Sequence, residues 1–142
     1  EILEYVGTAD CGTVVHPQGL EHQIRGGAVM GIGMGGLERI VYDPQNGLAG
    51  NVGFYQNKPP SYLDVPPEMD VGYVDIADPT NPVGARGIGE PLQGCAAAAL
   101  LCAISDALGG VYFNRTPIVP DMIINALAGQ PQSYKTLQIA NQ

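Results

Sequence analysis

The feature that most constrains this chain is a run of glycines that leads into a single carboxylate. The run reads Gly84-Ala85-Arg86-Gly87-Ile88-Gly89-Glu90-Pro91. Pro91 suits the first position of a helix, where its missing N–H would have no partner, so Glu90 is expected at the N-cap. Gly84, Gly87 and Gly89 can adopt positive φ and allow the backbone to approach a ligand closely. We therefore predict a ligand-facing loop that carries Glu90 at the start of a helix.

The segment behind Glu90 contains no charged residue until Asp106. It is rich in alanine and leucine, which predicts an almost wholly buried helix that ends at Gly109-Gly110. A carboxylate on rigid, buried support suits an active site. An acidic residue at a helix start is also favoured by capping and by the helix dipole. These residues alone therefore leave two interpretations of Glu90, a catalytic group and a helix cap.

A second glycine-rich segment, residues 20–39, has the pattern of a helix. Its glycines are Gly26, Gly27, Gly31, Gly33, Gly35 and Gly36. Each helical glycine costs roughly 0.5–1 kcal/mol of helix stability relative to alanine. The six together cost about 3–6 kcal/mol, which is comparable to the free energy of unfolding of a small domain. Either a closely packed helix or a bulky cofactor must require this bare backbone, and the sequence leaves both open. The literal dinucleotide fingerprint from Gly31 to Gly36 is rejected, because it does not join a strand to a helix.

The remaining pattern predicts an α+β fold with mixed strands, a Gly-rich helix and a buried Ala-rich helix. Strands are expected at residues 2–8, 13–15, 40–42 and 71–76, with 51–55 as a hairpin partner of 40–42. Residues 56–70 are expected to form a proline-rich loop, and a short helix is expected from Pro120 to Gly129 with Met122, Ile123, Ala126 and Leu127 on its apolar face. The tail from Gln130 is expected to pack on other segments. Strand, glycine loop and helix in that order are typical of a site at a strand end.

Composition and charge exclude several classes of function. A net charge of −8, from 14 acidic and 6 basic residues, lacks the basic footprint of a nucleic-acid-binding protein. No apolar run reaches the ~18 residues that span a bilayer, and the first residues do not resemble a signal peptide. We therefore expect no nucleic-acid partner, no membrane span and a cytoplasmic location.

The cysteines, histidines and Asp10 indicate no metal bound by protein ligands. The three cysteines include no Cys-x-x-Cys pair, so reduced, mostly buried thiols are expected, and any iron–sulfur cluster must lie elsewhere. His16 and His22 are not spaced as ligands on one helical face and are predicted to lie on the surface. Asp10, two residues before Gly12, is predicted to accept a local backbone hydrogen bond.

Several segments resemble a known family in order and spacing. The loop from Gly84 to Pro91 and the helix behind it resemble the turn that carries the catalytic glutamate in the xanthine dehydrogenase and aldehyde oxidase family of molybdenum hydroxylases. Residues 9–17, 23–38, 54–66 and 115–121 are similar to further segments of that family. The molybdenum-binding part of the family is several hundred residues long. The resemblance therefore implies that residues 1–142 are the C-terminal segment of a larger molybdopterin-binding domain, as a fragment or a split subunit.

The resemblance also implies a reaction. The family hydroxylates an aldehyde or a carbon beside a ring heteroatom with oxygen from water, and Glu90 would be the general base on a molybdenum-bound hydroxyl. The alternative is a non-catalytic structural subunit around the pterin. Met30 replaces a glutamine that contacts the cofactor in many relatives, whereas His16 and Leu92 are milder departures.

The implied cofactor is molybdopterin with molybdenum, with or without a cytosine nucleotide, and it requires no metal ligand from the protein. The residues expected to contact it are Gly26, Gly27, Gly31, Arg86, Gly87, Ile88 and Gly89. For Arg86, a phosphate contact and a structural contact are both open. FAD and iron–sulfur clusters are expected on other segments or subunits. The implied partners are the rest of the large subunit, an iron–sulfur subunit, an FAD subunit and a small-molecule substrate.

Overall fold

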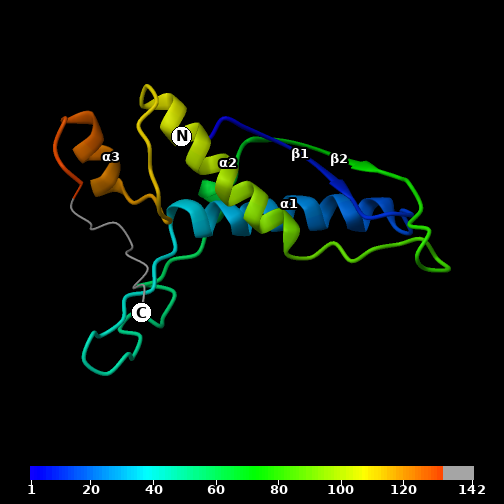
Figure 1. The fold of residues 1–142 in the computed structure, drawn as a ribbon, viewed down its shortest axis with the longest axis horizontal. Coiled ribbons are helices and arrows are strands. Elements are labelled where there is room, and N and C mark those ends of the chain that lie inside the picture. Colours follow the sequence, from blue (N-terminus) through cyan, green and yellow to red (C-terminus); the bar gives the residue numbers. More distant parts are fainter. Residues whose placement is uncertain (133–142) are drawn as a thin grey trace, which may run out of the picture.

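The computed structural model describes residues 1–132 and has an α+β architecture, as predicted (Figure 1). In chain order the elements are β1 (Glu4–Asp10), α1 (Pro17–Gly36), the short 3-10 helix η1 (Tyr62–Asp64), β2 (Glu68–Val74), α2 (Pro91–Ala107) and α3 (Pro120–Leu127). The predicted helices are all present, although α1 begins three residues earlier than expected. Pro17 stands at its start, and the His16 side chain accepts a hydrogen bond from the Gly19 N–H.

The sheet consists of β1 and β2, which pair in parallel from Glu4 beside Glu68 to Asp10 beside Val74. Both strands therefore end at the same edge of the sheet. The helix α1 packs along the strands, and α2 crosses α1 (Figure 1). The loop of residues 75–90, which joins β2 to α2 and contains Glu90, therefore starts at the edge where both strands end.

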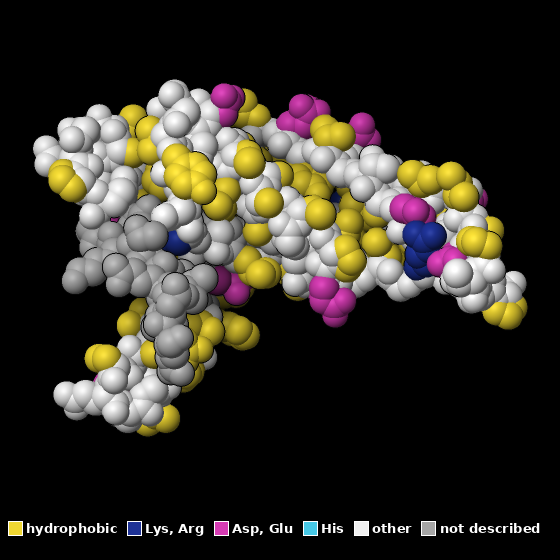
Figure 2. All heavy atoms as spheres, viewed as in Figure 1, with side chains coloured by type: hydrophobic (Ala, Val, Ile, Leu, Met, Phe, Trp, Pro, Cys, Tyr) yellow, Lys and Arg dark blue, Asp and Glu magenta, His cyan; other side chains and the backbone are white. Residues whose placement is uncertain are grey.

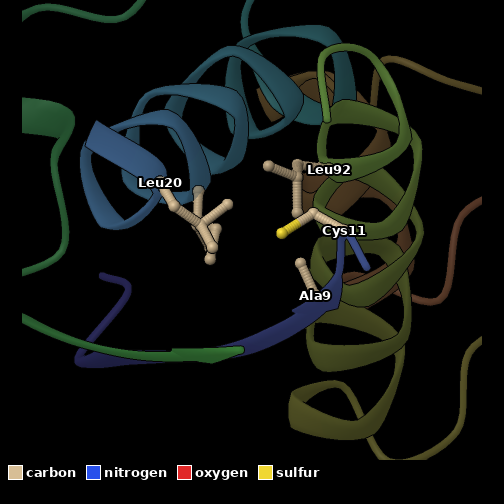
Figure 3. Close-up of a cluster of buried hydrophobic side chains, with 5 residues drawn as sticks. Ala9, Cys11, Leu20 and Leu92 are labelled. Carbon is tan, nitrogen blue, oxygen red and sulfur yellow. The ribbon is translucent and has the colours of Figure 1, made fainter. Parts of the chain in front are cut away.

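The main core lies between β1, α1 and α2. Figure 3 shows Ala9, Cys11, Leu20 and Leu92 pointing toward one another from these three elements, and Ile24 completes the cluster. A second cluster of Phe113, Ile118 and Met122 joins α3 to the end of α2. The core is therefore built where the two helices and β1 meet.

Three glycines allow α1 to approach α2 closely. A Cβ at Gly27 would lie 2.8 Å from Leu92 Cβ, and one at Gly35 would lie 3.1 Å from Leu100 Cδ2. At Gly31 a Cβ would press on the Gln93 carbonyl and lie 2.7 Å from Ala96 Cβ. Helix packing, one of the two explanations left open by the sequence, therefore accounts for the bare backbone at these positions.

The prediction that α2 is almost wholly buried is wrong. Only Leu92 and Ala96 of α2 are buried, because α1 covers just one side of the helix. Hydrophobic side chains are visible over the region where α2 crosses α1 (Figure 2). A groove of about 1280 Å³ runs along Ala96, Ala99 and Ala103 and is bordered by the start of the chain and residues 62–67. The apolar sequence of α2 therefore exceeds what residues 1–132 bury.

The thiol prediction is correct in part. All three cysteines are free, and Cys11 is buried, but Cys95 and Cys102 are exposed. Both exposed thiols lie on α2, whose burial was overestimated. In α3, Met122 is buried and Ile123 and Ala126 are partly buried, whereas Leu127 is 72% exposed, so its assignment to the apolar face is wrong.

The expected hairpin and the strand at 13–15 are also wrong. Residues 40–55 form a single bridge between Tyr42 and Ala49, and Gly12 forms a single bridge to Ala85. In the expected hairpin, the Asn51 side chain accepts a hydrogen bond from the Val41 N–H, and the Asp43 side chain accepts one from the Gln45 N–H. Side-chain partners thus compete with a strand ladder. Residues 56–70 are a loop interrupted by η1 and the start of β2.

The tail prediction concerns residues that lie mostly outside the described part, which ends at residue 132. Within that part, no helix is long and apolar enough to cross a bilayer.

Gly31→Ala is expected to destabilise the protein by about 1–3 kcal/mol, because a Cβ there overpacks the contact between α1 and α2. Gly94→Ala is the matched control, since a Cβ at this position of α2 meets nothing within 4 Å. The control should stabilise the protein by about 0.5–1 kcal/mol through helix propensity. Thermal unfolding of the protein that contains this chain measures whether Gly31→Ala lowers the melting temperature and Gly94→Ala raises it. Equal shifts for the two variants would contradict the packing argument.

Candidate active site at the glycine loop

The ends of both strands and the glycine loop are hydrogen-bonded to one another. The Gly84 carbonyl accepts the Thr13 N–H and the Asp78 N–H, both at 2.8 Å, and the Arg86 N–H donates to the Cys11 carbonyl at 2.6 Å. These bonds join residues that follow β1, residues that follow β2 and the loop that precedes α2. Gly84 and Arg86 thus attach the loop to the end of the sheet, before the chain reaches Glu90.

Two glycines make this junction possible. Gly12 and Gly84 have φ values of 69° and 73°, in the region that favours glycine. A Cβ at Gly12 would collide with the Gly84 carbonyl, and one at Gly84 would lie 2.7 Å from Thr13 Oγ1. Gly84 therefore uses the positive φ that glycine allows. The φ values of Gly87 and Gly89 are not positive.

The Asn81 side chain supports the loop from inside its turn. Asn81 Oδ1 accepts the Gly84 N–H at 2.6 Å, and Asn81 Nδ2 donates to the Ala85 carbonyl at 3.0 Å. On the strand side, Asp75 Oδ1 accepts the Val14 N–H at 3.0 Å. Polar side chains thus bond the backbone of Val14, Gly84 and Ala85, which lie outside the two paired strands.

An ion-pair cluster of Asp10, Arg86 and Asp78 lies at the same edge. Arg86 Nη1 lies 3.1 Å from Asp10 Oδ2, and Arg86 Nε lies 2.7 Å from Asp78 Oδ2. Basic atoms between acidic ones are visible at this end of the molecule (Figure 2). Asp10 Oδ1 also accepts the Gly12 N–H at 2.9 Å, which confirms the predicted local role. The ion pairs supply the structural contact proposed for Arg86, whereas its phosphate contact stays a prediction.

Asp78 is the most strongly stabilised carboxylate of the site. The Thr80 hydroxyl and N–H donate to Asp78 Oδ1 at 2.6 and 2.8 Å, and Arg86 bonds the other oxygen. These bonds, with those from Thr80 the largest cause, lower the pKa of Asp78 to about 2. The hydrogen bond to Asp78, followed by the negative charges of Asp10 and Asp78, raises the pKa of Arg86. Asp78 and Arg86 are therefore both charged at neutral pH.

Glu90 lies at the N-cap of α2, as predicted. Its φ of −72° and ψ of −24° are helical, and its side chain makes no capping hydrogen bond within the described structure. Its side chain is exposed, while Leu92 is buried in the main core and Ile88 packs against that core. The two apolar residues thus anchor the chain on either side of an exposed carboxylate. The capping interpretation gains no support from this geometry.

Three of the glycines expected at the cofactor have no packing reason within residues 1–132. A Cβ built at Gly26, Gly87 or Gly89 would meet nothing within 4 Å. By contrast, Gly27 and Gly31 lie in the contact with α2. Contact of all five glycines with a pterin stays a prediction.

The other residues considered as ligands form no bond to the ion-pair cluster within residues 1–132. His16 and His22 are exposed, as predicted, and His16 caps α1. The glycines of the literal dinucleotide fingerprint lie within α1, where we expected them. Met30 is an exposed side chain of α1, and its sulfur accepts a weak hydrogen bond from Gln93 Nε2 of α2 at 3.6 Å.

Sequence reasoning missed Asp78 and Asn81. Two signals could have identified them: a carboxylate follows each of two strands, and an arginine lies on the next loop. If the strands are parallel, their carboxyl ends and the following loops meet at one edge. The missing information was the pairing of β1 with β2.

Comparisons with known proteins identify the family of the chain. A family model described as a molybdopterin cofactor-binding domain matches residues 1–66. The nicotine 6-hydroxylase large subunit of Paenarthrobacter nicotinovorans is 34% identical over 122 residues, which cover 84% of this chain and 15% of that subunit. The chain belongs to the molybdopterin-binding subunits of the xanthine dehydrogenase and aldehyde oxidase family. The predicted resemblance is thereby confirmed.

Two further relatives are similar over most of the chain. The xanthine dehydrogenase molybdenum-binding subunit of Escherichia coli O157:H7 is 32% identical, over 78% of this chain and 14% of that subunit. The crystal structure of quinoline 2-oxidoreductase from Pseudomonas putida 86 matches with a TM-score of 0.79 and 33% identity, over 89% of this chain and 16% of that one. The chain thus spans about one sixth or less of the length of these proteins.

The pKa of Asp78 predicts how the ion-pair cluster responds to acid. Because that pKa is lowered on folding, the carboxylate stabilises the folded state above the ordinary pKa of 3.8, and the contribution is lost as pH falls toward 2. Asp78→Asn should therefore lower the melting temperature near pH 5, and the difference from wild type should shrink as pH falls toward 2. Thermal unfolding from pH 5 to 2 checks this. A difference that is constant across the range would contradict the assignment.

Proposed function

We propose that this chain is a C-terminal segment of the molybdopterin-binding part of a molybdenum hydroxylase, and that Glu90 is its general base. The observation that carries the proposal is an exposed carboxylate without a capping hydrogen bond, at the end of a loop that is attached to both strands. The segment is either a fragment of a longer subunit or a separate subunit.

The residues around Glu90 fit a large cofactor. Gly87 and Gly89 leave the backbone of the loop bare, and no contact within residues 1–132 requires them to be glycine. Their N–H groups and that of Ile88 can donate to an anionic or polar ligand. Gly26, Gly27, Gly31 and Arg86 complete the proposed contacts, with Gly26 on the exposed side of α1. When bound, molybdopterin supplies a molybdenum centre that accepts two electrons from the substrate and delivers an oxygen derived from water.

Glu90 would accept the proton released as that oxygen is transferred. A general base must be ionised when it acts and lie within hydrogen-bond reach of the proton. The exposed side chain makes no capping bond in the described structure, so either carboxylate oxygen can take the proton. Ile88 and Leu92 anchor the chain on both sides of Glu90. This anchoring would keep the base in place while it exchanges a proton.

The relatives suggest the substrate and the partners. We propose an aldehyde or a carbon beside a ring nitrogen as the oxidised group, in line with relatives named for nicotine, xanthine and quinoline. Because the named relatives are subunits, we propose the rest of the large subunit, an iron–sulfur subunit and an FAD subunit as partners. A cytosine nucleotide on the pterin and a cytoplasmic location belong to the same proposal.

Glu90→Gln in the assembled enzyme is expected to lower turnover per bound molybdenum by about 10²–10⁴-fold, the usual contribution of a general base. Molybdenum content should stay unchanged, since the amide keeps the shape of the side chain. Steady-state kinetics and elemental analysis measure the two quantities. Glu68→Gln, at another exposed glutamate at the start of β2, is the control and should behave like wild type. Turnover within a few fold of wild type in Glu90→Gln would instead favour a non-catalytic subunit around the pterin.

Gly89→Val tests the cofactor contact separately. The chain itself has room for a side chain at this position, so the melting temperature of the protein without cofactor should change little. If the loop backbone faces the pterin, bound pterin and molybdenum should fall by about tenfold or more, as for other changes beside a metal centre. Gly94→Val, at a second glycine with room for a side chain, is the control. Full cofactor content in Gly89→Val would contradict the proposed contact.

A further inference from the structure

We infer that Arg86 is a positioning residue for Glu90, and that the ion-pair cluster with Asp10 and Asp78 sets where the Glu90 carboxylate lies. The inference deepens the proposed function and rests on the role of Glu90 given there. In this account Arg86 acts on Glu90 through the loop, in addition to the cofactor contact proposed above.

Arg86 is held by both its backbone and its side chain. Its N–H donates to the Cys11 carbonyl at 2.6 Å, which ties the loop to the end of β1. Its guanidinium bonds Asp78 through Nε and Asp10 through Nη1. These donors belong to one rigid, planar group. One of these carboxylates ends β1 and the other follows β2, and together they fix both the position and the orientation of Arg86.

The loop beyond Arg86 has few contacts of its own. Gly87 and Gly89 carry no side chains, and glycine has the greatest backbone freedom of any residue. Only Ile88 packs against the core before Leu92 is reached in α2. The stretch that carries Glu90 is therefore held at its far end by α2 and at its near end by Arg86. Without the ion pairs, the near end would keep only its backbone hydrogen bonds and those of the Asn81 side chain.

The ion pairs are better suited to fixing the loop than to stabilising the whole fold. The side chains of Arg86 and Asp10 are each 46% exposed and that of Asp78 is 15% exposed, and ion pairs with an exposed partner add little to global stability. A catalytic group displaced by 1 Å, however, can cost a reaction about 10²-fold in rate. The arrangement therefore predicts a larger effect on turnover than on unfolding.

Asp78→Asn and Asp10→Asn in the assembled, cofactor-loaded enzyme test this inference. We expect kcat per bound molybdenum to fall by about 10–100-fold, with KM and molybdenum content little changed. Independently of activity, hydrogen–deuterium exchange of the amides of residues 84–90 should become faster. Asp78→Glu should restore part of the kcat and part of the slow amide exchange, because it keeps the negative charge. Glu21→Gln is the matched control, since it removes an exposed partner of Arg25 at 3.4 Å on α1, and it should change neither.

The outcomes separate this inference from the proposed function. Wild-type kcat and wild-type exchange in both aspartate variants would overturn the inference. Loss of molybdenum with unchanged exchange would also overturn it and leave Arg86 with the cofactor contact alone. Glu90→Gln in the same enzyme tests the proposed function alone. If that variant keeps its turnover, Glu90 is not the base, and the exchange measurements still decide whether the ion pairs hold the loop.

Discussion

The close approach of α1 and α2 through glycine is the contact on which the rest of this structure depends. A sheet of two parallel strands cannot form a core alone, because parallel strands need cover on their faces. Here α1 lies along the strands and α2 crosses α1, with Leu92 entering the space between α1 and β1 (Figure 3). Side chains at Gly27 or Gly31 would separate the helices and withdraw Leu92 from the core. The start of α2, and with it Glu90, is therefore placed by glycines far away in the sequence.

A second pair of glycines acts at the edge of the sheet. Gly12 and Gly84 bring the end of β1 and the loop before α2 into direct contact. Arg86 and its two aspartates bond the same segments through side chains. Backbone contact and ion pairing therefore converge on the residues that precede Glu90. Such rigid support is what the proposed role of Glu90 as a base requires.

Residues 1–132 leave much apolar surface uncovered. Ala99 and Ala103 of α2 line an open groove, and the exposed cysteines lie on the same helix. The sequence correctly indicated that this helix is apolar, but the depth of its burial depends on what surrounds it. A helix with apolar residues on all sides belongs in the interior of a large protein. This agrees with the small share of its relatives that the chain spans.

By itself, the sequence determined the three helices, the position of Glu90 at the start of α2 and the turn at Gly84. These follow from local chemistry: proline at helix starts, glycine at positive φ and long apolar runs. Only the tertiary structure decided that β1 pairs in parallel with β2, that Gly31 serves helix packing, and that Arg86 joins Asp10 to Asp78. These contacts join residues far apart in the chain, and no local pattern encodes which distant partner each residue meets. The expected hairpin failed for a related reason, because the Asn51 and Asp43 side chains supplied backbone partners that a strand would otherwise need.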